Sequence, residues 1–387
     1  MKEKKGQGKR ALVTGACGFV GTRLLNLLVK GGYQVRATDL ETANRKHVEE
    51  LGIEFMPADI TKPYMLRDVT KDVDMVFNIA SAFNYHMPRE LMEKINLDGA
   101  KNVCDAVLRY SPNATPFVHW STGEVYGYNM ADKRHLPPNE ELTEDYKNMT
   151  PGEAPYAKTK WEQEQLVWKY HEEQGLPAIS LRLGTVYGEG AFFARLINIF
   201  ADLTSMGIFP KNMNFRWPLV HVEDVAGAAL HLSKKRSAIG QVYNIVDDQR
   251  YNISDIVYAV AEYFSTELKD LKLPPMSKLW NTIPKGEIVM DIVRAAYKSL
   301  TDEFRKRGKR AWFDYDYAVA YIELILGMEE FADDFRTSNG KLKETGYKIK
   351  YPDIRGALPE MLDGFKKEGL LVKKPGLGHL LTKGLVF

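Results

Sequence analysis

At 387 residues, the chain can bury a large core and is long enough for two lobes or one large α/β unit. Its 53 basic residues nearly balance its 51 acidic residues, and the net charge of +2 indicates neither a nucleic acid nor a strongly acidic partner. The two cysteines lie far apart and the eight histidines show no ligand spacing, so we expect no metal site and a reduced, cytoplasmic compartment. The basic N-terminus continues without the apolar stretch of a signal peptide or a membrane span, which predicts a soluble protein.

Short apolar runs alternate with longer periodic segments through the first 120 residues. Strands are expected at 11–15, 33–40, 53–60, 73–81 and 117–122, with helices at 21–32 and 92–110. This alternation predicts parallel βαβ units with right-handed crossovers. The fold class we expect is α/β, a Rossmann-type doubly wound parallel sheet with a smaller C-terminal substrate lobe.

The second half begins with an expected helix at 156–173 and a strand at 178–186. Segments 218–232 and 241–246 are expected to return to the same sheet. We therefore predict an NAD(P)-binding domain at 1–187 plus 219–250, and a substrate-binding lobe at 188–218 plus 251–387.

The region 271–336 is an unusual insertion in that lobe. It contains the basic run "RKRGKR" at 305–310, followed by the aromatic residues Trp312, Phe313, Tyr315, Tyr317 and Tyr321. A basic run next to aromatics can lie against a membrane surface or a lipid-like substrate. A solvated helix with core aromatics stays open as the plainer interpretation.

A glycine-rich loop, "VTGACGFVG", follows the first strand and precedes the first helix. Its glycines, Gly15, Gly18 and Gly21, permit a tight turn, close approach of backbone amides to a pyrophosphate, and close packing of the helix on the strand. The position between a strand and a helix is the context that this pattern requires, so it predicts a dinucleotide site.

Asp39 stands at the end of the second expected strand, 18 residues beyond Gly21. A carboxylate there accepts hydrogen bonds from the ribose hydroxyls of NAD and repels the additional phosphate of NADP. We expect NAD, with NADP kept as an alternative because Arg36 and Arg45 lie nearby in the sequence.

Further motifs follow in a fixed order: "ADI" at 58–60, "NIAS" at 78–81, "STGEVYG" at 121–127, "YAKTK" at 156–160, "RLGTVYG" at 182–188 and "HVEDVA" at 221–226. With the glycine loop, they make the chain resemble the extended short-chain dehydrogenases/reductases, the NAD-dependent epimerase/dehydratase superfamily. The resemblance covers roughly residues 9–265, with a weaker match at 337–362. The region 271–336 has no counterpart.

The resemblance implies that Asp59 contacts the adenine, and that Asn78, Ala80 and Ser81 line the nicotinamide side of the cofactor. Asn96 matches a helix asparagine that is often found in this fold. The full cofactor-binding set is expected to be Gly15, Cys17, Gly18, Phe19, Val20, Gly21, Asp39, Asp59, Ile60, Asn78, Ala80, Ser81, Asn96, Tyr156, Lys160, Leu183, Thr185 and Val186.

The resemblance also implies a catalytic group in which Tyr156 is the acid/base, Lys160 its partner, Thr122 the hydroxyl that holds the substrate oxygen, and Ser121 its neighbour. Oxidation of a secondary alcohol requires a base whose pKa lies near neutrality. Tyrosine titrates near ~10, so about 4 kcal/mol of preferential phenolate stabilisation is needed. A cationic Lys160 one helical turn away, together with a positive nicotinamide ring, supplies a field of the right sign.

Two departures from the nucleotide-sugar enzymes point to an apolar substrate. Those enzymes usually carry Phe-Asn where this chain has Gly184 and Thr185, and Arg-Asp-Phe where it has 217–219, Trp-Pro-Leu, although Arg216 lies one residue away. Both changes remove phosphate-binding groups and add apolar surface. They favour the hydroxysteroid-dehydrogenase-like and flavonol-reductase-like branch, and an NAD(P)-dependent alcohol/ketone oxidoreductase.

Alternatives stay open at this point. Glu124 matches a glutamate that assists proton removal in sugar-nucleotide dehydratases and decarboxylases, so it is a further catalytic candidate and a nucleotide-sugar epimerase, dehydratase or decarboxylase is the second hypothesis. A non-catalytic NAD(P)-binding redox sensor is the third. A small-molecule substrate and a homodimer, common in this superfamily, complete the expected partners.

Overall fold

The computed structural model describes residues 8–83, 87–127, 141–147, 149, 151, 155–189, 204, 208–209, 216–270 and 336–367. Its main sheet has seven strands: β1 (Arg10–Thr14), β2 (Gln34–Thr38), β3 (Glu54–Phe55), β4 (Met75–Asn78), β5 (Phe117–Thr122), β7 (Ala178–Leu183) and β11 (Gln241–Ile245). All neighbours are parallel, in the order β11-β7-β5-β4-β1-β2-β3. The predicted doubly wound parallel sheet is therefore confirmed.

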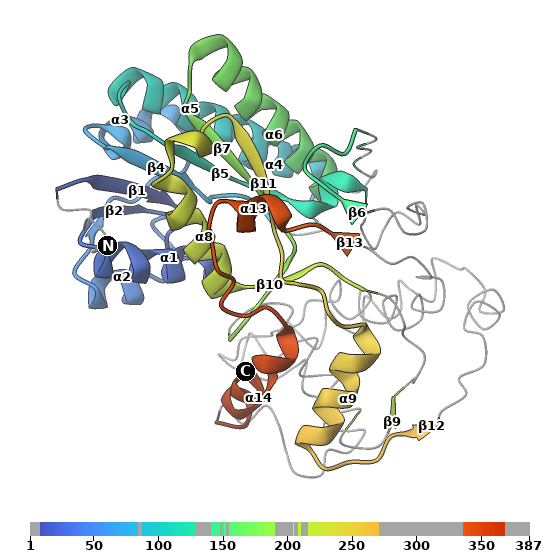
Figure 1. Cartoon of the computed structure of the whole chain (residues 1–387). Coiled ribbons are helices and arrows are strands. Elements are labelled where there is room, and N and C mark those ends of the chain that lie inside the picture. Colours follow the sequence, from blue (N-terminus) through green and yellow to red (C-terminus); the bar gives the residue numbers. More distant parts are fainter. Residues whose placement is uncertain are drawn as a thin grey trace, which may run out of the picture.

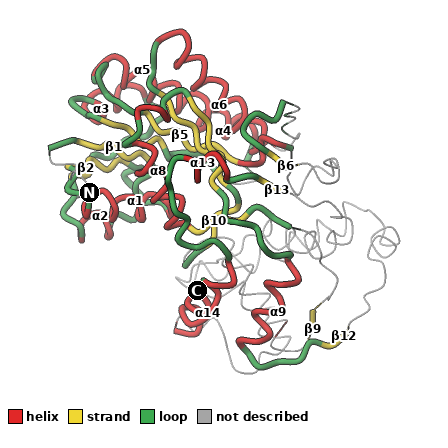
Figure 2. The backbone as a smooth tube through the Cα atoms, in the orientation of Figure 1, coloured by secondary structure: helices red, strands yellow, loops and turns green. Residues whose placement is uncertain are grey.

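Helices cover both faces of this sheet (Figure 1). The described α-helices are α1 (Phe19–Lys30), α2 (Lys46–Glu50), α3 (Leu66–Thr70), α4 (Arg89–Glu93), α5 (Gly99–Tyr110), α6 (Pro155–Gln174), α8 (Val222–Ser233), α9 (Ile253–Tyr263), α13 (Gly340–Glu344) and α14 (Leu358–Lys367). One apolar core lies between the sheet and α1 and α8, and a second lies between the sheet and α3, α5 and α6. Figure 2 shows the strands as the middle layer between these two groups of helices. Strands buried on both faces explain why their sequences read as continuous apolar runs.

The helix expected at 92–110 is interrupted. Between α4 and α5 the chain makes a π-helical segment, Lys94–Asp98, in which the buried Asn96 lies. Short 3₁₀ segments occur at Pro63–Met65 (η1), Gly123–Tyr126 (η3), Arg236–Ala238 (η4) and Ile354–Gly356 (η5). The π-segment matters for the site because such segments redirect backbone and side-chain groups.

The expected strand at 178–186 breaks at Gly184. The Gly184 amide donates to Ile245 O at 3.1 Å, and the next amide, of Thr185, donates to Pro218 O at 2.7 Å. A Cβ at position 184 would lie 2.7 Å from Pro218 O, so the crossing requires glycine. The chain thus leaves the main sheet here.

Segment 218–232 is predicted to return to the main sheet, and for the strand within it this prediction is wrong. β10 (Leu219–His221) pairs in parallel with β8 (Thr185–Tyr187) in a separate two-stranded sheet, because the chain has already turned at Gly184. Its helix, α8, does cover the main sheet, and 241–245 joins it as β11, as expected. Two further short pairs join β6 (Glu141–Leu142) to β13 (Arg336–Thr337) and β9 (Ile208–Phe209) to β12 (Lys269–Asp270).

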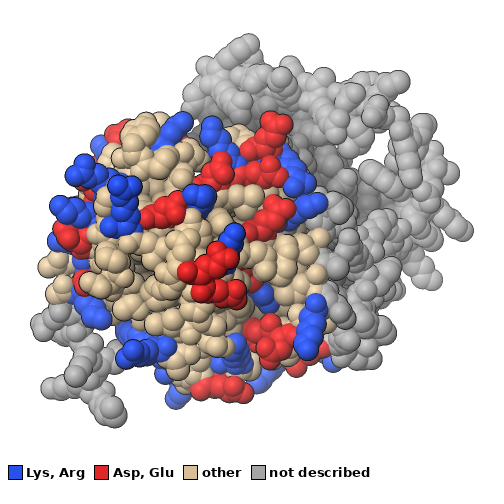
Figure 3. Space-filling view, turned by 90° about the horizontal axis from the view of Figure 1, so that it is seen from above, with Lys and Arg blue, Asp and Glu red and all other residues tan. Residues whose placement is uncertain are grey.

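The division into a cofactor domain and a substrate lobe stays a prediction, as does the homodimer. Residues 271–335, with the basic run and the aromatic cluster, lie outside the described residues, as do most of 190–215. On the face seen from above, basic and acidic side chains are intermixed (Figure 3). No described helix combines the length and the apolarity that a membrane span requires.

Candidate active site

The glycine loop has the geometry that its sequence predicts. Gly15 has a φ of +64°, and a Cβ there would lie 3.0 Å from the backbone of Ala80. At Gly21 a Cβ would lie 2.4 Å from Gly15 O, so helix α1 packs too closely on the loop for any side chain. Helix α1 begins at Phe19, directly after Gly18, and no side chain of its N-cap residue bonds to its first amides. These features suit a pyrophosphate.

Asp39 lies beside this loop, at the carboxyl end of β2. Its Oδ2 accepts from the amide of Cys17 at 2.9 Å, which ties the carboxylate to the glycine loop. Arg36 is buried, and its guanidinium donates to Glu54 and to backbone carbonyl groups of α3 and of the residue after it. Arg45 is paired with Glu49 at 3.0 Å. Both arginines proposed for an NADP phosphate are thus engaged elsewhere, which favours NAD.

The carboxyl end of β4 continues the same edge of the sheet. Thr14 Oγ1 donates to Asn78 Oδ1 at 2.9 Å and accepts from the amides of Ile79 and Ala80, each at 3.1 Å. This threonine, which the sequence analysis missed, fixes the turn after β4. The signal for it was its place at the end of β1, directly before Gly15.

The adenine-side candidates lie on the neighbouring segment. The amide of Ala58 donates to Asp39 O at 2.9 Å, so the chain passes Asp39 just before Asp59. Asp59 is partly exposed and accepts from Thr61, while Ile60 is buried against Gly99. These positions are compatible with the predicted contact to the adenine.

Thr122 and Tyr156 come together at the carboxyl end of β5. Their side chains share a hydrogen bond, and Glu124, in the 3₁₀ turn after Thr122, lies close enough to act on the phenol. Burial raises the pKa of Tyr156 above its usual value, the Glu124 charge raises it further, and only the Thr122 hydrogen bond lowers it. Ser121, which precedes Thr122 on β5, is buried. Thr122, Glu124 and Tyr156, three of the predicted catalytic residues, are thereby in one place.

Lys160, another predicted catalytic residue, lies one helical turn after Tyr156 on α6. Its side chain points into the protein interior. Its ammonium donates to Trp120 O at 2.6 Å and to Ser81 Oγ at 3.3 Å. Burial lowers the pKa of Lys160 to about 7, against the opposing charge of Glu164. The ammonium is held by the strand carbonyl, and the expected lowering of the Tyr156 pKa by Lys160 stays a prediction.

Aromatic side chains lie against Tyr156 and against Thr185. Phe83 packs edge-on against its ring, with centroids 5.0 Å apart, and is 47% exposed. Trp217 donates from Nε1 to Thr185 Oγ1 at 2.7 Å, so the hydroxyl predicted to meet the cofactor is held by a tryptophan. Beyond Thr122 a further cluster is formed by Val125, Tyr126, Leu142, Tyr146, Met149, Trp161 and Trp217.

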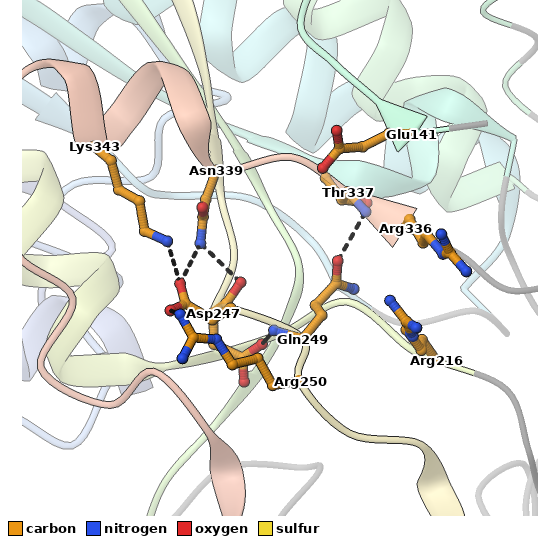
Figure 4. Close-up of a pocket in the computed structure, with 10 residues that line it drawn as sticks. Glu141, Arg216, Asp247, Gln249, Arg250, Arg336, Thr337, Asn339 and Lys343 are labelled. Atoms are coloured by element: carbon orange, nitrogen blue, oxygen red, sulfur yellow. Dashed lines mark hydrogen bonds and ion pairs between the residues drawn. The ribbon is translucent and has the colours of Figure 1, made fainter. Parts of the chain in front are cut away.

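A separate, charged pocket of about 160 Å³ lies at the carboxyl end of β11 (Figure 4). It is lined by Glu141, Arg216, Asp247, Asp248, Gln249, Arg250, Arg336, Thr337, Asn339 and Lys343. Arg216 and Arg336 extend into the same side of it from different segments. Asp248 is paired with Lys343 and, at 3.2 Å, with Arg250. In the part of the chain that the structure describes, no group of three or more candidate ligands could hold a metal ion.

A doubly wound sheet with a glycine loop at its first turn defines a dinucleotide-binding protein of the α/β class. The sequence model of the NAD dependent epimerase/dehydratase family matches residues 11–246. The chain belongs to this family, and the NAD prediction is confirmed at that level.

Known relatives include both reductases and sugar-nucleotide enzymes. Vestitone reductase from Medicago sativa is 24% identical over 82% of this chain and 95% of its own. A trifunctional UDP-glucose 4,6-dehydratase/UDP-4-keto-6-deoxy-D-glucose 3,5-epimerase/UDP-4-keto-L-rhamnose-reductase from Arabidopsis thaliana is 27% identical over 67% of this chain, but this chain spans 40% of its length. The crystal structure of Thermus thermophilus UDP-glucose 4-epimerase in complex with NAD superposes with a TM-score of 0.63, at 21% identity over 92% of this chain and 99% of its own.

Proposed function

We propose that this protein is an NAD(P)-dependent oxidoreductase that interconverts a secondary alcohol and a ketone on a mainly apolar substrate. The observation that carries the proposal is the hydrogen-bonded pair of Thr122 and Tyr156, with Phe83 packed edge-on against the phenol ring. Trp217 adds an apolar wall, held through Thr185, at the place where phosphate-binding groups are expected in sugar-nucleotide enzymes. The similarity to vestitone reductase supports the same branch.

The residues of this chain supply the acid–base part of the reaction. The bound nicotinamide supplies the hydride acceptor or donor. During alcohol oxidation Tyr156 takes the proton from the substrate oxygen, and during ketone reduction it returns that proton to the oxygen. Thr122 orients the oxygen from the end of a rigid strand, and the charge of Lys160 favours the phenolate. Asp39, the glycine loop and the turn after β4 hold the cofactor.

A nucleotide-sugar enzyme that acts through a transient ketone is the second candidate. Two observations favour it: Glu124 acts on Tyr156, as a carboxylate that assists proton removal would, and the pocket beyond β11 has four basic side chains. In the sheet, β11 is separated from β5 by β7 alone. The non-catalytic sensor is less well supported, because the chain keeps both Tyr156 and Lys160.

The test is a turnover assay with NADH or NADPH, using a panel of aryl and alicyclic ketones beside UDP-, GDP- and dTDP-sugars. We expect an apolar ketone to oxidise the cofactor stoichiometrically. Tyr156→Phe should lower kcat by about 10²-fold or more while NADH binding, followed by fluorescence, is retained. The matched control is Tyr64→Phe, since Tyr64 is 78% exposed on η1.

Turnover of a sugar nucleotide alone, with no apolar ketone reduced, would contradict the proposal in favour of the second candidate. Cofactor binding without turnover of any compound in the panel would favour the sensor. Equal kcat values for Tyr156→Phe and Tyr64→Phe would show that Tyr156 takes no part in the reaction.

A further inference from the structure

The ammonium of Lys160 is surrounded by acceptors. Besides Trp120 O and Ser81 Oγ, it donates to Gln163 Oε1 at 2.5 Å. An ammonium has three N–H donors and no acceptor, so these three groups use its whole hydrogen-bonding capacity. Lys160 is 2% exposed, and water therefore cannot replace a lost partner easily.

Gln163 bridges Lys160 to a second part of the site. Its Nε2 donates to the backbone carbonyl of Asn96 at 2.7 Å, and its side chain is 1% exposed. Because the amide nitrogen must face that carbonyl, the amide oxygen must face the ammonium. A flipped amide would place its oxygen against the Asn96 carbonyl and its NH₂ group against the ammonium. The orientation of Gln163 is thus settled by its two partners.

The π-segment places Asn96 for this contact. Its side chain accepts from Ser81 Oγ at 3.0 Å and from the amide of Ala82 at 2.7 Å, and it donates to Thr159 Oγ1 at 3.2 Å. The side chain of Asn96 therefore fixes the loop after β4, while its carbonyl fixes Gln163 on α6. Lys160 is held between these two elements and β5.

Two opposing effects set the pKa of Lys160. Burial brings its pKa to about 7, so modest changes in the surrounding acceptors decide its charge near neutrality. On α6, Glu164 opposes the effect of burial. The other titratable or charged groups on this part of α6 and on the elements packed around it include Tyr156, Lys158 and Glu162 on α6, Lys94 and Asp98 on the π-segment, His119 on β5, Arg182 on β7, Glu124 in η3, Arg89 and Glu93 on α4, and Lys101 and Asp105 on α5.

We propose that Gln163 is a positioning residue that keeps Lys160 charged and directed at β5 by linking its ammonium to the Asn96 carbonyl. Its effect on turnover rests on the proposed function, but its effect on Lys160 does not. Two of the three acceptors also bond to Asn96: Ser81 through its hydroxyl to the Asn96 side chain, and Gln163 through its amide nitrogen to the Asn96 carbonyl. The two hydrogen bonds of one amide therefore couple the charged group to the π-segment.

Two variants test the proposal, because they should shift the pKa of Lys160 in opposite directions. Gln163→Leu removes the acceptor, so Lys160 should lose its proton at a pH lower by about one unit. Gln163→Glu places a carboxylate there and should raise that pH by about the same amount. Gln165→Leu is the control, because it makes the same change on the same helix at an exposed position. The readout is the NMR titration of 13Cε-labelled lysine, with the Lys160 signal identified by its absence in Lys160→Met.

The second readout is the pH profile of kcat/KM, once a substrate is known. If charged Lys160 assists the reaction, the basic limb should move to lower pH in Gln163→Leu and to higher pH in Gln163→Glu. A purely structural role would change the stability of the protein without moving this limb. If Gln163→Leu does not fold, Gln163→Glu carries the test, and its upward shift supports the proposal.

An unchanged Lys160 titration in the folded Gln163 variants, relative to Gln165→Leu, would overturn the proposal. Shifted titrations in a protein that turns over no ketone would overturn the proposed function and leave the positioning role supported. Shifted titrations with an unmoved basic limb would show that Gln163 does not act on the reaction through Lys160.

Discussion

At the scale of single residues, Tyr156 lies beside Thr122, but its pKa is raised and not lowered. Burial and Glu124 raise the pKa of Tyr156, while the ammonium of Lys160 donates to a strand carbonyl. A base near neutrality is needed for alcohol oxidation. We therefore expect the phenol to become acidic only when the positive nicotinamide ring is bound, so that proton abstraction is coupled to cofactor binding.

The carboxylate of Asp39 is expected to select the cofactor. Asp39→Ser should weaken NADH binding by about tenfold and reduce the preference for NADH over NADPH, because the ribose hydroxyls lose an acceptor and the added phosphate is no longer repelled. Fluorescence titration with both reduced cofactors measures this. Asp68→Asn is a suitable control because Asp68 is exposed on α3. An unchanged NADH/NADPH ratio in Asp39→Ser would show that selectivity lies elsewhere.

At the scale of elements, helix α6 carries the proposed catalytic residues Tyr156 and Lys160 and is fixed by a buried ion pair. Arg182 Nη2 on β7 contacts Glu164 Oε1 at 2.6 Å, and the two side chains are 5% and 0% exposed. The same guanidinium donates to Tyr126 OH at 3.0 Å, and that hydroxyl donates to Asn244 on β11. One network therefore joins the helix, two strands and the turn after Thr122.

Glu164→Gln should leave the Arg182 charge without its counter-ion and lower the free energy of unfolding by roughly 3–5 kcal/mol. Glu162→Gln is the matched control, because Glu162 lies on the same helix, is 36% exposed and contacts Arg89 only at 3.8 Å. We expect less than about 0.5 kcal/mol for the control. Urea denaturation compares the two variants, and equal midpoints would mean that the ion pair does not hold α6.

The elements also show what sequence reasoning could and could not reach. The glycine loop and Asp39 were found because strand, turn and helix each have a local pattern. The π-segment around Asn96 and the break at Gly184 have none: each depends on a contact with a distant segment, the first with Gln163 and the second with Pro218. Gln163 itself looks like any polar residue in a helix until the carbonyl that it meets is placed.

At the scale of the whole molecule, a buried carboxyl links stability to pH. Asp247, at the end of β11, is 1% exposed, and burial raises its pKa to about 8, against the hydrogen bonds from Tyr251 and Gln249. The folded state therefore holds this proton more tightly than the unfolded state. The stabilisation is complete below the unfolded pKa near 4 and is lost as pH rises through 8.

Asp247→Asn keeps the side chain neutral at every pH. We expect its stability relative to the natural chain to rise between pH 5 and 8, by at most about 1.4 kcal/mol per pH unit, and to level off above that range. Melting temperatures of both proteins across this range measure the difference. A constant difference from pH 5 to 8 would contradict a raised pKa at Asp247.

The architecture of the whole molecule follows largely from the motif order, because parallel strands collect their carboxyl ends, and hence the site, at one edge of the sheet. Asn78 and Thr122 stand at the carboxyl ends of the neighbouring strands β4 and β5, and Tyr156 meets Thr122 there although it is distant in the chain. The substrate side was less predictable. Phe83 and Trp217, which we propose as its walls, come from loops whose positions depend on tertiary packing.

The most direct measurement follows the ionisation of Tyr156 itself. The chain labelled with 13Cζ-tyrosine is titrated by NMR with and without NAD⁺, and the Tyr156 signal is identified by its absence in Tyr156→Phe. Without cofactor the phenol should titrate above ~10, and with NAD⁺ bound its pKa should fall to about 7. A phenol that stays protonated past pH ~10 in the NAD⁺ complex would contradict its role as the acid/base.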